Sequence, residues 1–95
     1  MDRNEIEGLL SKHKPILREN YFVSRIGLFG SYARDEQTEQ SDIDILVDFD
    51  GPIAFEFLDL KDYLERLFAK KVDLVTIRSL KPYVKNDVLN EVRYA

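Results

Sequence analysis

The segment LFGSYARDEQTEQSDIDILVDF, residues Leu28–Phe49, decides how this sequence is interpreted. An apolar run ends at Gly30-Ser31, and a polar connection leads to a second run that opens with Asp42-Ile43-Asp44. In the second run apolar residues recur at every other position, which is the period of a strand with one buried face. The other face carries carboxylates, which are costly to desolvate unless they are paired or bound to a metal ion. The segment therefore predicts two strands with a functional connection.

Asp42 and Asp44 are the first candidates for a metal site. Two residues apart on a strand, they project from the same face with Cα atoms about 6 to 7 Å apart. Asp73 opens another predicted strand, and three carboxylates converge if the two strands are neighbours. Oxygen ligands without His or Cys favour Mg²⁺ or Mn²⁺ over zinc. Solvent-exposed aspartates near strand ends are the alternative explanation.

Gly30 and Ser31 suit the binding of an anion. A glycine lets the backbone approach a ligand closely, and a helix beginning at Ser31 would direct its free N–H groups toward a phosphate. The serine hydroxyl would add a hydrogen bond. An ordinary strand–turn–helix with a serine cap explains the same two residues. Together with the carboxylates, however, this loop predicts a site for a metal-bound phosphate compound.

The rest of the chain predicts one α/β domain, residues 1–95, built on a small sheet. Pro15 should kink the first helix or start a second one. Ser79 is the expected cap of the last helix. The predicted elements are helix 2–13, strand 24–29, a short helix from residue 31, strand 42–49, helix 53–69, strand 72–77 and helix 79–94.

Composition and charge exclude several classes of protein. The 95 residues include no cysteine, which excludes disulfides and thiolate metal sites. The net charge of −4 argues against general nucleic-acid binding, which needs clustered cations. No run approaches the roughly 20 apolar residues of a membrane span, and the N-terminus lacks the apolar region of a signal peptide. We therefore expect a cytoplasmic protein with no membrane association.

The motifs taken together resemble a known family. Gly30-Ser31, ten intervening residues and Asp42-Ile43-Asp44 match the G-S-x10-D-x-D pattern of the DNA polymerase beta-like nucleotidyltransferase superfamily. The segments LFGSYAR, SDIDILVDF and KKVDLVT are similar to those of its minimal nucleotidyltransferase (MNT) family. The resemblance implies the polymerase beta-like palm fold, a small mixed β-sheet with helices packed on one face.

The resemblance also implies a reaction and the residues that perform it. A hydroxyl would attack the α-phosphorus of ATP, and pyrophosphate would leave. Two Mg²⁺ ions would stabilise the entering and departing oxygens. The implied metal ligands and catalytic residues are Asp42, Asp44 and Asp73, and the implied nucleotide contacts are Gly30, Ser31 and Arg34.

Residue 35 departs from the family pattern. Such proteins usually continue as A-R-G, whereas this sequence has Ala33-Arg34-Asp35. If the glycine serves a left-handed helix end, Asp tolerates that geometry less well. We expect weaker activity rather than none. Arg34 itself is either a phosphate contact or a solvated helix residue.

A partner protein is the expected acceptor, because 95 residues leave little beyond a catalytic core. The resemblance implies an antitoxin that transfers AMP to a tyrosine of a HEPN-domain toxin, a ribonuclease, within a hetero-oligomer. Tyr83 and Tyr94 are candidate contacts, with core packing as the alternative. Two other functions stay open: a non-catalytic antitoxin that occludes the toxin, and a transferase acting on a small-molecule hydroxyl.

Overall fold

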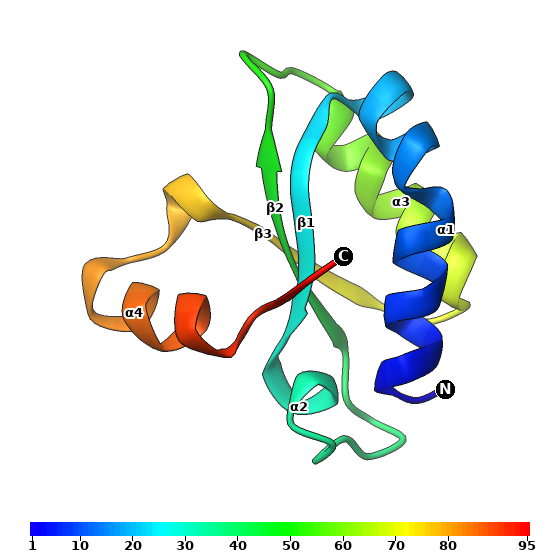
Figure 1. Cartoon of the computed structure of the whole chain (residues 1–95), viewed down its shortest axis with the longest axis vertical. Coiled ribbons are helices and arrows are strands. Elements are labelled where there is room, and N and C mark those ends of the chain that lie inside the picture. Colours follow the sequence, from blue (N-terminus) through cyan, green and yellow to red (C-terminus); the bar gives the residue numbers. More distant parts are fainter.

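A four-stranded mixed sheet forms the centre of the computed structural model, which describes all 95 residues (Figure 1). The strands are β1 (Val23–Phe29), β2 (Ile43–Phe49), β3 (Val72–Thr76) and β4 (Arg93–Tyr94), in the order β3-β2-β1-β4. β1 pairs antiparallel with β2 and β4, whereas β2 and β3 are parallel. Helix α3 (Glu56–Phe68) provides the crossover that a parallel pair requires. The predicted mixed α/β sheet is confirmed, and its first three strands end within one residue of the predicted positions.

Helices cover the two faces of the sheet unequally. Helix α1 (Arg3–Tyr21) and α3 pack together on one face, whereas α4 (Pro82–Glu91) lies on the opposite side (Figure 1). No residue of α4 is buried, so it contributes little to the core. The one-turn helix α2 (Gly30–Ala33) joins the end of β1 to the loop before β2. None of these helices is long and apolar enough to cross a membrane.

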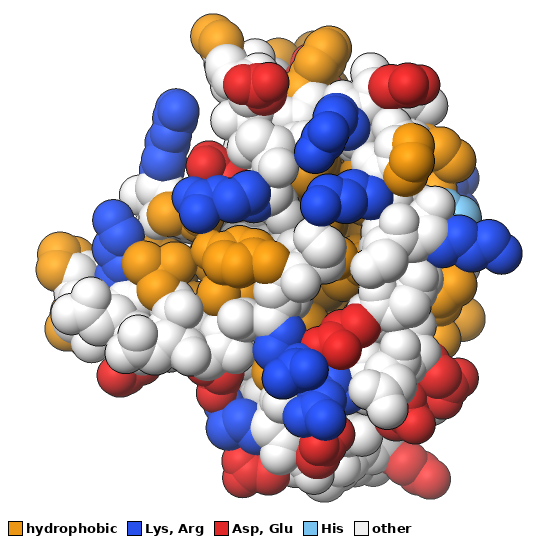
Figure 2. Space-filling model, in the orientation of Figure 1, with side chains coloured by type: hydrophobic (Ala, Val, Ile, Leu, Met, Phe, Trp, Pro, Cys, Tyr) orange, Lys and Arg blue, Asp and Glu red, His pale blue; other side chains and the backbone are white.

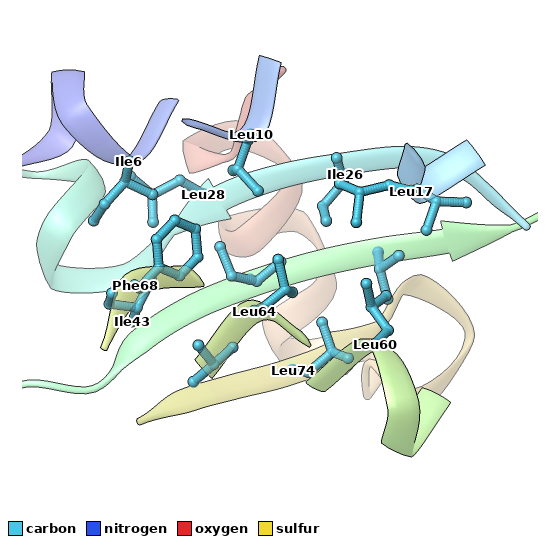
Figure 3. Packing of buried hydrophobic residues seen from close by; sticks show 14 of the residues in the cluster. Ile6, Leu10, Leu17, Ile26, Leu28, Ile43, Leu60, Leu64, Phe68 and Leu74 are labelled. Atoms are coloured by element: carbon cyan, nitrogen blue, oxygen red, sulfur yellow. The ribbon is translucent and has the colours of Figure 1, made fainter. Parts of the chain in front are cut away.

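The hydrophobic core lies between the sheet and the pair α1–α3 (Figure 3). The alternate residues of β2 supply its centre, as the period-two pattern predicted, and the intervening aspartates lie on the other face. Burying one aliphatic side chain of this size contributes about 1.5 to 3 kcal/mol. The fully buried side chains of the core are Ile6, Leu10, Leu17, Ile26, Leu28, Ile43, Ile45, Val47, Leu60 and Leu64.

The first helix runs continuously through Pro15 to Tyr21, so it is longer than predicted and no second helix starts at the proline. Proline inside a helix removes one backbone hydrogen bond and costs about 3 kcal/mol. Leu17, which follows the proline, is fully buried in the core. Burial beyond the proline therefore offsets the local cost and keeps the helix continuous.

The boundaries of the later helices also differ from the prediction. Helix α3 begins at Glu56 rather than residue 53, because the Glu56 side chain accepts the Ala54 N–H at 2.7 Å and holds the preceding loop outside the helix. Ser79 does not cap α4 but ends a short 3₁₀ turn, Ile77–Ser79. Helix α4 starts at Pro82, since a proline keeps the residue before it extended.

The C-terminal residues form a strand where the sequence predicted helix. Helix α4 ends at Glu91, and Val92 is extended. The Val92 side chain lies over Gly27, where an added Cβ would approach it to 2.7 Å. Arg93–Tyr94 then pair with β1, and the Ala95 N–H donates to the Ile26 carbonyl at 2.9 Å. A two-residue strand is too short to leave a periodic signal in sequence.

Candidate active site

The glycine loop and the first carboxylate meet because β1 and β2 are adjacent. Phe29 pairs with Asp44 across the antiparallel ladder, so Gly30 follows where the Asp44 side chain projects. Gly30 has φ 74°, and a Cβ added there would lie 2.0 Å from Asp44 Oδ2. A side chain at residue 30 would therefore displace the carboxylate. The glycine is needed for this close approach, as well as for its left-handed backbone.

The parallel pair β2–β3 brings the carboxylates together. Asp44 lies opposite Asp73 in the register of the two strands. Burial, the charge of Asp73, a hydrogen bond shared with Asp73 and the charge of Asp42 raise the pKa of Asp44 to about 6, and the Arg34 guanidinium opposes this. Asp42 precedes β2 and lines the same cleft as Asp73. All three carboxylates thus lie at one end of the β2–β3 pair, and their metal-binding role stays a prediction.

The donor set fits a hard divalent cation. The three carboxylates offer only oxygen atoms, although no three His, Cys, Asp or Glu side chains are grouped closely enough to hold a metal ion by themselves. Mg²⁺ does not require such a cage, because it commonly binds one or two carboxylates together with water and substrate phosphates. A cation here would also relieve the repulsion from Asp73 and Asp42 that, after burial, raises the pKa of Asp44.

A carboxylate at the end of α4 accepts hydrogen bonds from two groups that were expected to bind phosphate. The Gly30 N–H donates to Glu91 Oε2 at 2.9 Å, and Arg34 Nη1 donates to Glu91 Oε1 at 2.5 Å. Arg34 Nε also donates to Glu36 Oε1 at 2.7 Å. Although burial opposes its ionisation, the bonds from Arg34 and Gly30 lower the pKa of Glu91 below its usual value. Sequence analysis missed Glu91, because nothing local marks a residue 57 positions away from Arg34.

Comparisons with known proteins agree with this geometry. The family model described as nucleotidyltransferase domain matches residues 10–95. The chain belongs to this family. It is 50% identical, over 95% of its length and 92% of the relative's, to protein adenylyltransferase MntA of Thermococcus cleftensis. It is also 50% identical, over 96% of its length and 95% of the relative's, to a candidate protein adenylyltransferase of Methanocaldococcus jannaschii.

Solved structures place the chain in the MNT branch of the nucleotidyltransferases. A candidate minimal nucleotidyltransferase superposes with a TM-score of 0.77 at 35% identity, covering 98% of this chain and 95% of the other. A toxin–antitoxin structure with AMP-PNP gives 0.68 at 29%, covering 99% and 72%. A complex of an MNT antitoxin with a tri-AMPylated HEPN toxin from Shewanella oneidensis gives 0.58 at 28%, covering 97% and 66%. The predicted fold class is confirmed.

The short helix of this nucleotidyltransferase loop begins one residue earlier than predicted. Helix α2 begins at Gly30 and has four residues, so it has no appreciable macrodipole. What it offers an anion is individual N–H groups rather than a helix end. Ser31 follows Gly30 and is partly exposed, which leaves its hydroxyl accessible at the same point.

Asp35 adopts the left-handed conformation that the usual MNT glycine would favour. Its φ is 57°, and its carboxylate pairs with Arg3 at 3.1 Å. The left-handed backbone costs an L-residue about 1 to 2 kcal/mol. The ion pair is partly exposed and offsets only part of this cost. Asp at this position therefore carries a conformational cost that a glycine would not carry.

A cleft of about 570 Å³, lined by both acidic and basic side chains, adjoins the carboxylates. Its lining residues are Asp42, Asp73, Glu65, Val72, Lys61, Lys70 and Lys71. Lys70 donates to a backbone carbonyl of the loop before β2 at 2.8 Å. Three lysines of this MNT protein thus lie in the same cleft as Asp42 and Asp73, although its net charge is negative.

Proposed function

We propose that this MNT protein is an antitoxin that transfers AMP from ATP to a tyrosine hydroxyl of a HEPN-domain toxin in a Mg²⁺-dependent reaction. The observation that carries the proposal is the packing of Asp44 between Gly30 and Asp73. This packing brings an anion-binding loop and a carboxylate cluster into contact. The names of the relatives support AMP transfer to protein, and the toxin–antitoxin complexes support the HEPN partner.

The residues of the chain divide the chemistry between them. Gly30, Ser31 and Arg34 would orient the triphosphate, while Asp42 and Asp44 would hold the divalent ions. The bound ions would supply Lewis-acid stabilisation of charge on the phosphate oxygens. The tyrosine oxygen forms a bond to the α-phosphorus as the bond to the bridging oxygen breaks, and pyrophosphate departs.

A carboxylate is available for the proton that the tyrosine loses. Asp73 is exposed, whereas Asp44 beside it is half-buried. Asp73 is therefore the group that an incoming hydroxyl can reach, provided that it is not fully engaged as a metal ligand. General-base assistance of this kind contributes about 10² to 10⁴ in rate.

Inhibition by occlusion is the second candidate function, and it would need an exposed surface that binds the toxin. Tyr83 on α4 is 75% exposed and Tyr94 on β4 is 43% exposed, so neither packs in the core. Hydrophobic side chains are visible over α4 and the C-terminal strand in the space-filling view (Figure 2). Such a surface suits protein contact, and it serves a catalytic antitoxin as well as a passive one.

The decisive experiment combines this protein, its HEPN partner, ATP and Mg²⁺, and measures the intact mass of the partner. We expect stepwise additions of AMP that disappear in Asp42→Asn and Asp44→Asn. Asp48→Asn is the matched control, because Asp48 lies on the same strand but pairs with Arg25 at 3.6 Å. Transfer that persists in both active-site variants would refute catalysis by these carboxylates. Neutralisation of the toxin without transfer would establish occlusion instead.

A further inference from the structure

Glu91 makes contacts of the kind that a nucleotide phosphate would make. Its two carboxylate oxygens accept hydrogen bonds from the Gly30 N–H and the Arg34 guanidinium, one oxygen to each donor. A phosphate group offers the same features, two negatively charged oxygens that can bridge a backbone N–H and an arginine. The carboxylate therefore acts as an internal substitute for an anionic ligand.

The helix that carries Glu91 does not itself explain the position of this carboxylate. Glu91 is the last residue of α4, where the negative end of the helix dipole disfavours an acidic side chain. Its favourable partners all come from the loop after β1. The attraction is thus between the carboxylate and the anion-binding loop rather than within α4.

Glu91 can leave this loop without disturbing the core. Its side chain is 24% exposed, and no residue of α4 is buried. The chain after it is held independently, since Gly27 pairs with Tyr94 and Lys14 Nζ donates to the Ala95 carbonyl at 2.9 Å. A rotation of the Glu91 side chain would therefore free both donors while β4 stays in the sheet.

We propose that Glu91 competes with the triphosphate for the Gly30 N–H and the Arg34 guanidinium, and so sets the affinity of the site for polyphosphates. This inference rests on the proposed function in assigning the triphosphate to that loop. In the free protein the carboxylate satisfies both donors, and a polyphosphate must replace it. The apparent affinity is then lower than the intrinsic affinity by the fraction of molecules in which the loop is free.

Inorganic tripolyphosphate without metal tests the competition directly, because it contains the proposed competing group but no base or reaction. We expect Glu91→Gln to bind it about tenfold more tightly than the wild type in calorimetry, the size of effect given by a charge-assisted hydrogen bond. Glu36→Gln is the matched control, since it removes a charge bound to Arg34 but leaves Gly30 held. It should change the affinity by about threefold or less.

Amide NMR supplies a readout that is independent of affinity. In the wild type, tripolyphosphate should shift the Gly30 amide and the Glu91 side-chain carboxyl resonance together, because the two separate. Unchanged or weaker binding by Glu91→Gln, with an unchanged melting temperature, would overturn competition and make Glu91 a positioning residue. Equal gains in Glu91→Gln and Glu36→Gln would also overturn it, since general charge repulsion would explain both.

The result of the tripolyphosphate test can be distinguished from the result of the AMP-transfer test of the proposed function. Tighter tripolyphosphate binding by Glu91→Gln, without AMP transfer by either protein, would support the competition and reject the transferase. AMP transfer with unchanged affinity in Glu91→Gln would do the reverse. No binding of tripolyphosphate to either protein would reject the competition.

Discussion

Ionised Asp44 should destabilise the metal-free protein, so its removal should stabilise the fold while it abolishes activity. Partial burial, together with the neighbouring carboxylates, raises the pKa of Asp44 from an ordinary 3.8 to about 6. Each pKa unit corresponds to about 1.4 kcal/mol, so a fully buried group would cost about 3 kcal/mol. Because water screens this half-buried group, we expect Asp44→Asn to raise the free energy of unfolding by about 1 kcal/mol at pH 8.

The direction of the pH dependence of stability follows from proton binding by Asp44. Between pH 3.8 and about 6 the folded protein holds the Asp44 proton more tightly than the unfolded chain does. The free energy of unfolding therefore falls as the pH rises through this range, and the deficit is complete above the folded pKa. In Asp44→Asn this contribution is absent. The advantage of the variant should vanish below about pH 4, where both states of the wild type are protonated.

Thermal melts followed by circular dichroism, in EDTA from pH 4 to 8, measure the effect. For a domain of this size, about 1 kcal/mol corresponds to roughly 4 to 8 °C in melting temperature. Asp48→Asn should be neutral or slightly destabilising, because it removes an ion pair with Arg25, whereas Asp44→Asn removes repulsion between carboxylates. Added Mg²⁺ should raise the melting temperature of the wild type more than that of Asp44→Asn. An Asp44→Asn protein that melts below the wild type at pH 8 would refute the reasoning.

Three further substitutions test other parts of the structure. Gly30→Ala places a Cβ 2.0 Å from the Asp44 carboxylate in a left-handed backbone. We expect the free energy of unfolding to fall by at least about 1 kcal/mol in thermal melts and most AMP transfer to be lost. Full activity in this variant would contradict the packing of Gly30 against Asp44. Asp35→Gly relieves the left-handed backbone but loses the ion pair with Arg3, so stability should change by less than about 1 kcal/mol. Its nucleotide affinity and transfer rate should not fall, and a fall in either would show that Asp35 assists the site. Leu64→Ala empties a fully buried core position and should cost about 2 to 5 kcal/mol in denaturant unfolding, with a smaller loss implying that the core collapses to fill the space.

Much of the fold could be predicted because short-range patterns determine strands and helices. The alternation in β2 assigned its faces, and the same alternation put Asp44 opposite the core. The pairing of Gly30-Ser31 with the carboxylates identified the family, which its relatives confirmed. The course of α1 through Pro15 was not predictable in this way, since it depends on the burial of Leu17 against other elements.

The composition of the site depended on contacts between distant residues. The neighbourhood of Asp44 and Asp73 requires the parallel register of β2 and β3, which neither segment encodes alone. Glu91 reaches Gly30 only because the C-terminal strand returns to β1 and sets the end of α4 over the loop. Local periodicity reports which face of an element is apolar, whereas the joining of two elements depends on the packing of the whole chain. Residues 30, 42 and 44 were therefore visible in sequence as a motif, but the carboxylate that occupies the loop became apparent only in the folded molecule.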